Sequence, residues 1–237
     1  MKLVIPKQHG AWAMLIAPFV IGVGACGFIG YHVPLFIGWT LLYLATYPIL
    51  LAFKREDLRS YFRSILTYLI PALLCLSVTL VYSWRLLLIG LLMLPFFLVN
   101  LYYAKKNRER SFINGLCATV IFSIGGLASY YLGTGYLDNK AAIVWALSVL
   151  FFTGSLFFVK SMIREKRNIM FRVISSGYHV LLLVISWALG VPWLFFAFLP
   201  STIRSTAFYG KPLSIKGVGI VEVVNSVYFI IMCLVYL

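Results

Sequence analysis

The sequence predicts an all-α, polytopic membrane protein that forms a single integral membrane domain over residues 1–237. Three observations predict this fold class. Of the 237 residues, 62% are hydrophobic and only 11% are charged, whereas soluble domains carry about a quarter charged residues. The apolar residues form runs long enough to cross a bilayer. The 20 Lys and Arg residues outnumber the 6 Asp and Glu, and they gather between those runs.

Nine apolar runs are expected to form transmembrane helices. In lipid, each backbone amide must be satisfied within its own segment, which requires about 17 to 25 residues per helix. The expected spans lie near Ala11 to Phe28, Val33 to Phe53, Ile65 to Tyr82, Leu86 to Tyr103, Ile113 to Leu132, Ala141 to Val159, Val173 to Leu189, Pro192 to Ile203 and Val218 to Leu237. The eighth run is short, and the charges of the loops support it. Prolines interrupt the first four spans: Pro18, Pro48, Pro71 and Pro95.

The loops alternate sharply in charge, and Lys and Arg in short loops favour the cytoplasmic side. Arg85 and Lys140 fall on one side. The other side carries Lys2, Lys7, Lys54, Arg55, Arg59, Arg63, Lys105, Lys106, Arg108, Arg110, Lys160, Arg164, Lys166, Arg167, Arg172, Arg204, Lys211 and Lys216. This split predicts nine spans, a cytoplasmic amino terminus and a carboxyl terminus on the opposite side.

This composition excludes an ordinary soluble enzyme. The positive charge marks one side of a membrane, so the expected partners are membrane lipids and not nucleic acid. Four cysteines lie singly inside apolar runs, without the spacing of a zinc site or a disulfide framework. We therefore expect them to be packing residues, and we expect no metal and no cofactor.

Basic residues after the second, fourth, sixth and eighth spans are candidates for an anion-binding site. If the helices close into a bundle, these residues converge at one cytoplasmic mouth, where Arg and Lys can hold a phosphate or diphosphate head group. The alternative is that they set the orientation and contact anionic lipid heads. Lys160 and Arg164 stand out because a spacing of four places them on one helical face. The candidates are Lys54, Arg55, Lys105, Lys106, Lys160, Arg164 and Arg204.

A second set of candidates comprises polar residues in or beside the spans: His9, Asn100, His179, Glu222 and Asn225. Glu222 is an acid in a strongly apolar context, so its carboxylate should face the bundle interior, either neutral or paired with a base. It either has a functional role or pairs with Arg204 or a neighbouring Arg as a structural clamp. His179 either accepts a proton or donates to a carbonyl on a neighbouring helix.

Several segments resemble the bacterial YwiC-like family of membrane proteins, over essentially the whole chain. These segments are residues 7–14 (KQHGAWAM), 164–166 (REK), 211–213 (KPL) and 219–222 (GIVE). The resemblance implies a multi-pass protein of a bacterial cytoplasmic membrane. It implies no particular activity.

More distantly, the layout is similar to that of the UbiA superfamily of intramembrane prenyltransferases. The resemblance implies a nine-helix bundle, and residues 102–106 (YYAKK) resemble a segment that helps these enzymes bind prenyl diphosphate. UbiA enzymes carry Asp-rich, magnesium-binding motifs after spans two and six. Here those places read FKREDLR (53–59) and KSMIRE (160–165), which retain Glu56, Asp57 and Glu165 beside cations. We therefore expect no magnesium-diphosphate cluster, and whether the chain is a divergent transferase stays open.

Three functions remain open. The first is binding of an anionic lipid or isoprenoid phosphate at the basic mouth without magnesium, with the aromatic-rich bundle around the tail. The second is a small-solute or proton-coupled transporter, in which His179, Glu222 and Asn225 line a path. The third is a non-catalytic membrane assembly factor, which needs nothing beyond the helices.

Overall fold

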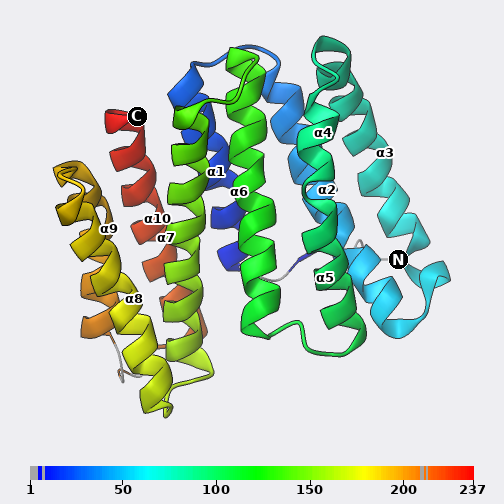
Figure 1. The fold of residues 1–237 in the computed structure, drawn as a ribbon. Coiled ribbons are helices and arrows are strands. Elements are labelled where there is room, and N and C mark those ends of the chain that lie inside the picture. Colours follow the sequence, from blue (N-terminus) through cyan, green and yellow to red (C-terminus); the bar gives the residue numbers. More distant parts are fainter. Residues whose placement is uncertain (1–4, 7–8, 209–210, 212) are drawn as a thin grey trace.

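The protein is an all-helical bundle, which a computed structural model describes over residues 5–6, 9–208, 211 and 213–237. Within these ranges ten helices follow one another and no strand occurs. The helices lie side by side as long rods (Figure 1). Their bounds are α1 His9–Cys26, α2 His32–Arg55, α3 Leu58–Tyr82, α4 Leu86–Leu91, α5 Leu94–Lys105, α6 Phe112–Thr134, α7 Asn139–Ile163, α8 Ile169–Ala188, α9 Pro192–Ala207 and α10 Ile215–Tyr236.

The nine predicted spans each correspond to one rod, because α4 and α5 continue one another over Leu86–Lys105. Seven rods are long and apolar enough to cross a membrane, and the apolar part of α1, Gly10–Cys26, is shorter. The short eighth span corresponds to α9, which extends to Ala207. The prediction of an all-α polytopic bundle is therefore confirmed, and the helices identify a multi-pass membrane protein.

Two helix boundaries differ from the expected spans for clear local reasons. The helix expected from Ile65 begins at Leu58, because the Asp57 carboxylate caps it by accepting from the backbone N–H of Ser60 at 3.1 Å. The fourth rod breaks just before Pro95, which has no N–H to donate to the preceding turn. By contrast, α1, α2 and α3 run through their internal prolines without a break.

Helix α1 lies at the centre of the bundle and contributes to both large hydrophobic cores. Ala17 and Ile21 belong to a core formed with α7, α8, α9 and α10. Leu15 and Phe19 belong to a second core formed with α2, α4 and α6. Because both of its sides are covered, α1 joins an amino-terminal half, α2 to α6, to a carboxyl-terminal half, α7 to α10.

The contact between α1 and α6 is close enough to require small residues. A Cβ atom on Gly126 would lie 2.8 Å from the carbonyl oxygen of Pro18, and one on Gly22 would lie 2.4 Å from the carbonyl oxygen of Gly126. At the same crossing, the Ser129 hydroxyl donates to the carbonyl of Phe19 at 2.9 Å. Because Gly22 and Gly126 have no side chains, α1 and α6 can pack closely and form this hydrogen bond.

His32 connects two elements of the amino-terminal half, at the end of the bundle opposite most of the basic residues. It is buried at the start of α2, and its Nδ1 accepts from the backbone N–H of Ile29 at 2.9 Å. Its Nε2 then carries the proton and donates to the carbonyl of Ser129 at 2.9 Å. The imidazole therefore ties the α1–α2 connection to α6.

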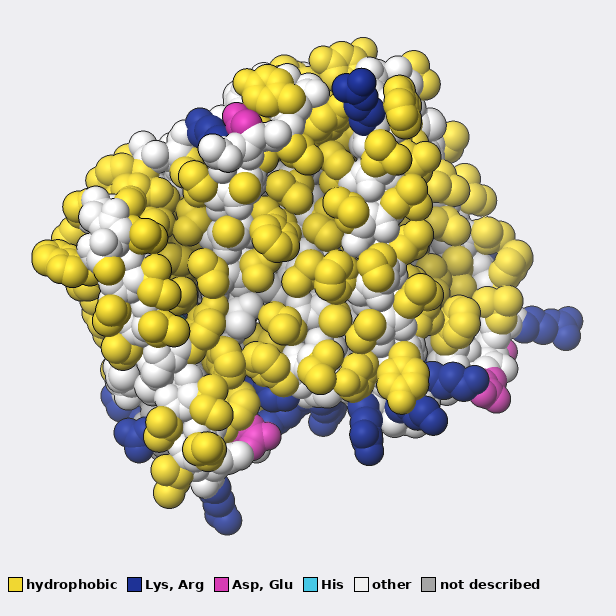
Figure 2. Space-filling view, viewed as in Figure 1, with side chains coloured by type: hydrophobic (Ala, Val, Ile, Leu, Met, Phe, Trp, Pro, Cys, Tyr) yellow, Lys and Arg dark blue, Asp and Glu magenta, His cyan; other side chains and the backbone are white. Residues whose placement is uncertain are grey.

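The surface is divided into an apolar belt and a basic edge. Figure 2 shows hydrophobic side chains over the height of the helices and most Lys and Arg side chains along the lower edge. Large apolar side chains such as Val81, Ile169 and Trp187 are at least 74% exposed, as expected where lipid is the solvent. The carboxyl terminus lies at the end opposite the basic edge (Figures 1 and 2).

Candidate functional site

The predicted basic mouth lies at the lower edge of the bundle, where α2, α5 and α7 end and α3, α6, α8 and α10 begin (Figures 1 and 2). Six of its seven predicted members belong to the ends of α2, α5 and α7 or the residues that directly follow. They are Lys54, Arg55, Lys105, Lys106, Lys160 and Arg164. The seventh, Arg204, lies inside the bundle.

Two of these cations are paired with acids on neighbouring elements. Lys54 at the end of α2 forms an ion pair with Glu109 in the α5–α6 loop. Lys105 at the end of α5 lies 3.5 Å from the Glu56 carboxylate, which follows α2. These pairs hold the ends of α2 and α5 together, and they partly neutralise the charge on this side of the mouth.

Glu109 is held in its ionised form by its neighbours. Partial burial opposes ionisation, but the Lys54 hydrogen bond and the charges of Lys54 and Arg110 outweigh it and lower the pKa of the Glu109 carboxyl. The pair with Lys54 is therefore ionic at neutral pH.

Three cations gather where α7 ends and α6 begins: Arg110, Lys160 and Arg164, here called the Arg110 cluster. Lys160 Nζ donates to the backbone carbonyl of Arg110 at 3.0 Å, and Arg164 donates to the same oxygen at 3.1 Å. The prediction that Lys160 and Arg164 lie on one face is thus confirmed, although α7 ends at Ile163 and Arg164 forms its C-cap. The shared acceptor fixes both side chains beside the amino-terminal end of α6.

The Arg110 cluster brings three positive charges together, with Glu109 near Arg110 and Glu165 near Lys160. Burial and the charge of Arg110 both lower the pKa of the Arg164 guanidinium, which shows that the two like charges repel each other. Ser111 caps α6 by accepting from the N–H of Asn114 at 3.1 Å, so the positive end of the helix dipole lies at the same place. A bound anion would relieve this repulsion.

An aromatic seam adjoins the Arg110 cluster on the membrane side. Lys160 Nζ lies 5.9 Å from the centre of the Phe112 ring, which packs on Phe157 at 4.6 Å. Phe157 contacts Phe171 at 5.8 Å and Tyr178 at 5.1 Å. The seam therefore runs from the basic edge into the apolar belt across α6, α7 and α8.

Glu56, Asp57 and Glu165, considered above as remnants of a magnesium motif, each have a protein partner. Glu56 pairs with Lys105, Asp57 caps α3, and Glu165 accepts from the Asn168 side chain at 2.9 Å. Each carboxylate thus already has an ion pair or a hydrogen bond with another group of the protein. Among the described residues, no group of three His, Cys, Asp or Glu side chains could hold a metal ion.

The carboxyl-terminal half contains a buried layer of polar side chains, here called the polar layer. All of its members are at most 5% exposed, and they come from α7, α8, α9 and α10. They are Ser155, Ser175, His179, Ser201, Arg204, Ser205, Glu222, Asn225 and Ser226. It includes three predicted intramembrane residues: His179, Glu222 and Asn225.

Apolar clusters lie on both sides of the polar layer. Toward the basic edge, Phe158, Met162 and Val218 form a small buried core. Toward the other end, Phe198 and Phe229 belong to the large carboxyl-terminal core. On α7 and α10 the polar layer thus lies between two apolar clusters.

Arg204 and Glu222 form a buried ion pair between α9 and α10. The guanidinium also donates to the Ser155 hydroxyl of α7 at 3.2 Å and stacks 4.5 Å over the Phe158 ring. Of the two interpretations of Glu222, pairing with Arg204 is confirmed. Arg204 is 3% exposed, so its predicted place among the accessible cations of the mouth is wrong, because its charge is used inside the bundle.

His179 and Asn225 complete the contacts inside the polar layer. The His179 Nδ1 lies 2.7 Å from the carbonyl of Ser175 one turn earlier, so its hydrogen bond is made within α8 and not to a neighbouring helix. Its Nε2 lies against Gly154 of α7, where a Cβ atom would come within 3.0 Å. Asn225 donates to the Ser201 hydroxyl at 3.0 Å.

Several buried polar atoms of this region lack a hydrogen-bond partner. They are the Nε2 of His179, the Nε of Arg204 and the hydroxyl of Ser226. Unpartnered buried polar groups are uncommon in proteins because each forfeits the hydrogen bonds it makes in water. The polar layer thus retains unused donors and an unused acceptor.

Two predicted polar residues lie outside the polar layer or the described side chains. Asn100 is on α5, which packs against α2 and α6 and therefore does not join His179 or Glu222. His9 begins α1, but its side chain lies outside the described part of the structure, as do Lys2 and Lys7.

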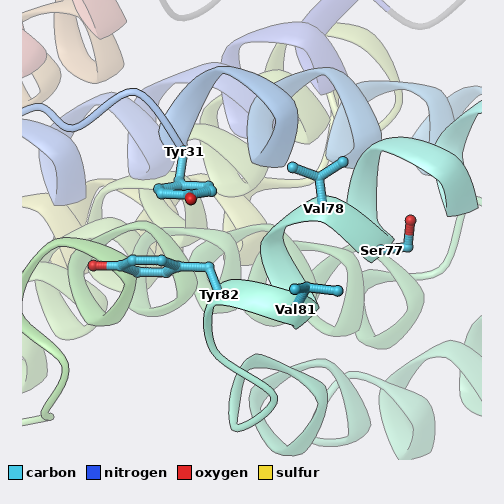
Figure 3. A pocket seen from close by; sticks show the side chains of 5 residues that line it. All are labelled: Tyr31, Ser77, Val78, Val81 and Tyr82. Carbon is cyan, nitrogen blue, oxygen red and sulfur yellow. The ribbon is translucent and has the colours of Figure 1, made fainter.

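A shallow hollow of about 590 Å³ opens at the end of α3 away from the basic edge. Figure 3 shows Tyr31 and Tyr82 facing one another at its lining, with their ring centres 4.2 Å apart in a stacked arrangement. Ser77, Val78 and Val81 complete its lining. It contains no charged side chain, so it does not suit an anionic head group.

Sequence comparisons agree with the resemblance found in the sequence. The profile described as YwiC-like protein matches residues 5–130. A Bacillus subtilis protein described as uncharacterized protein YwiC is 43% identical over 235 residues, which cover 99% of this chain and 98% of that protein. An uncharacterized protein of Haemophilus influenzae is 36% identical over 98% of both chains. No solved structure matches this chain, so the similarity to the UbiA bundle stays a prediction.

Proposed function

The chain belongs to the YwiC-like family, and from this premise we propose that it binds the phosphate group of an anionic lipid or of an isoprenoid phosphate at the Arg110 cluster. In this proposal the basic edge faces the cytoplasm of a bacterial cell, and the amino terminus lies on that side. The phosphate binds directly to Arg and Lys side chains, without magnesium.

One observation carries the proposal: Lys160 and Arg164 both donate to the backbone carbonyl of Arg110. The two donors meet at this oxygen, and the Arg110 charge acts on Arg164, so three cations lie near one another. A phosphate carries several acceptor oxygens and can bind a guanidinium and an ammonium at once. The cluster therefore offers a better phosphate site than the basic edge as a whole.

The tail of the ligand would follow the aromatic seam. Phe112, Phe157 and Phe171 connect the cluster to the lipid-facing side of α7. An isoprenoid or acyl chain lying there stays within the hydrocarbon region while its phosphate remains at the interface. The proposal concerns binding and includes no transfer reaction.

Native mass spectrometry of the detergent-purified protein tests this function with farnesyl phosphate and with phosphatidylglycerol as probes. Farnesol and phosphatidylcholine are the controls for tail and zwitterionic head group. We expect both phosphate probes to bind in the presence of EDTA, and Lys160→Ala/Arg164→Ala to weaken them by about tenfold or more, since charge-assisted hydrogen bonds contribute about 1.5–3 kcal/mol each.

The matched control is Arg59→Ala/Lys216→Ala, which removes one Arg and one Lys from exposed positions at the same edge. If the two double variants lose affinity equally, general attraction to the basic edge explains binding and the assignment to the Arg110 cluster is wrong. If EDTA abolishes binding, the metal-free mode is wrong. If only one of the two phosphate probes binds, that probe identifies whether the site binds a phospholipid head group or an isoprenoid phosphate.

A further inference from the structure

The polar layer holds charges that balance within it. Arg204 and Glu222 are its two formally charged side chains, and each is at most 5% exposed. A buried charge is costly unless an opposite charge compensates it. Any ligand that enters must therefore keep the total charge near zero.

The surroundings of Glu222 leave Arg204 as its charged partner among the described side chains. Helix α10 packs against α1, α7 and α9. Two ionisable groups of α7 are Lys160, which is bound to Arg110, and Lys140, which lies at the opposite end of α7. The described side chains of α1 that face α10 are apolar. His179 and Tyr178 of α8 lie against α7, where a Cβ atom on Gly154 would come within 3.0 Å of the His179 Nε2 and the Tyr178 hydroxyl donates to the carbonyl of Leu150.

A proton on Glu222 would leave Arg204 without its counter-ion. The guanidinium stays protonated under ordinary conditions, and its hydrogen bond to Ser155 carries no compensating charge. Arg204 would then require another anion in place of the Glu222 carboxylate. Proton uptake and anion binding are thus coupled by the charge balance of the polar layer.

The contacts also indicate the class of anion. Arg204 already binds a carboxylate, that of Glu222, and carboxylates match the planar donor arrangement of a guanidinium. The Nε of Arg204 and the hydroxyl of Ser226 are additional buried donors without partners. The polar side chains are at most 5% exposed, and apolar clusters flank them along α7 and α10, so a ligand with few atoms beyond its carboxylate is favoured.

We propose that the polar layer binds a small monocarboxylate together with one proton. The ion pair between Glu222 and Arg204 breaks, Glu222 takes a proton from solution, and the carboxylate of the ligand forms a new ion pair with Arg204. The total charge of the layer does not change. The bound species is equivalent to a neutral carboxylic acid enclosed between two apolar layers of a membrane protein.

This inference is independent of the phosphate site. It rests on the contacts of α7 to α10 inside the bundle, whereas the Arg110 cluster lies at the surface. Acetate has no lipid tail, and farnesyl phosphate is too large for the polar layer. Separate probes therefore report on the two sites.

Isothermal titration calorimetry of the purified protein with acetate tests the proposal without any substitution. Titrations in buffers of different ionisation enthalpy give the number of protons taken up. Above the pKa of Glu222, we expect one proton per acetate and an affinity that rises about tenfold for each unit of decrease in pH. Acetamide, which has a similar shape but no charge, should not bind.

Substitutions then assign the two roles. Glu222→Gln imitates the protonated acid, so acetate should bind without proton uptake and with little dependence on pH. Arg204→Gln should abolish binding. Glu165→Gln is the matched control, because it removes an acid at the surface and should leave both the affinity and the proton count as in the unmodified protein.

The opposite results would overturn the proposal. If the unmodified protein does not bind acetate at any pH at which it stays folded, Arg204 and Glu222 are a structural clamp only. Acetate binding without proton uptake in the unmodified protein would exclude the exchange at Glu222. The proton count needs no variant, so the proposal remains testable even if Glu222→Gln does not fold.

Discussion

Replacing Gly22 with alanine should separate α1 from α6. The new Cβ would lie 2.1 Å from the hydroxyl oxygen of Ser129 and 2.4 Å from the carbonyl oxygen of Gly126. The hydroxyl can rotate away, but the carbonyl belongs to the backbone of α6. Since Cβ atoms essentially never approach other atoms closer than 3.0 Å, the helices must move apart by at least 0.6 Å, the difference between 3.0 and 2.4 Å.

The magnitude follows from three contributions. Forcing an extra methyl group into a packed interior costs about 1–3 kcal/mol. Separation also weakens the hydrogen bond from Ser129 to Phe19, which is 2.9 Å long and contributes about 1 kcal/mol. Alanine regains about 1 kcal/mol of helix propensity over glycine. We therefore expect Gly22→Ala to lower the free energy of unfolding by about 1–3 kcal/mol.

Reversible unfolding in mixed micelles, followed by circular dichroism, measures this change. Gly177→Ala is the matched control, because Gly177 is also inside a helix but a Cβ there would meet no atom within 4 Å. The control should be neutral or slightly stabilising. If Gly22→Ala is as stable as Gly177→Ala, the close α1–α6 contact does not determine stability and the reasoning from the clash is refuted.

Three further predictions concern other parts of the molecule. The pKa of Glu109 is lowered in the folded state. The ion pair of Glu109 therefore stabilises the protein at pH values above its ordinary pKa of 4.5, and this stabilisation is lost as the pH falls through the folded-state pKa. The difference in melting temperature between the unmodified protein and Glu109→Gln should narrow over that pH range. His32→Leu should destabilise the protein by about 1–3 kcal/mol, measured by the same unfolding assay, because it removes the acceptor of the Ile29 N–H and the donor to the Ser129 carbonyl. In a cysteine-free background, Tyr136→Cys should react with an impermeant maleimide on intact cells. Lys106→Cys should react only after the cells are permeabilised. The reverse pattern would refute the predicted orientation.

The positions of the membrane helices were readable from the sequence because apolar length and loop charge are local properties. Each of the nine predicted spans matches one rod. The early start of α3 also had a local signal, since Asp57 precedes Leu58 and Ser60 in an N-cap arrangement. Only the helix-capping role of Asp57 was overlooked, because the same residue was considered as a remnant of a metal-binding motif.

The contacts between helices were only partly predictable. The pairing of Glu222 with Arg204 was one of two alternatives, because a buried carboxylate needs a base. The role of Arg110 was missed, since its backbone carbonyl is the acceptor and carries no sequence signal. The serines of the polar layer, Ser155, Ser175, Ser201, Ser205 and Ser226, were missed as well.

A periodic signal for the polar layer was nevertheless present. Ser175 and His179 are four residues apart, and Ser201, Arg204 and Ser205 follow a spacing of three and four. The residues 222, 225 and 226 repeat that spacing on the last helix. Such spacing places polar groups on one helical face. It predicts a shared interior surface, but the partners across the interface depend on the packing of the helices.

The central position of α1 sets a constraint on how the protein is made. The ribosome produces this helix before α6, α7 and α10, against which it packs, and α10 begins more than 180 residues later at Ile215. Until then the surfaces around Ala17 and Ile21 face lipid or the insertion machinery. The two halves can therefore close around α1 only after α10 has been made, and a chain that stops before α10 leaves one side of α1 without its native partner.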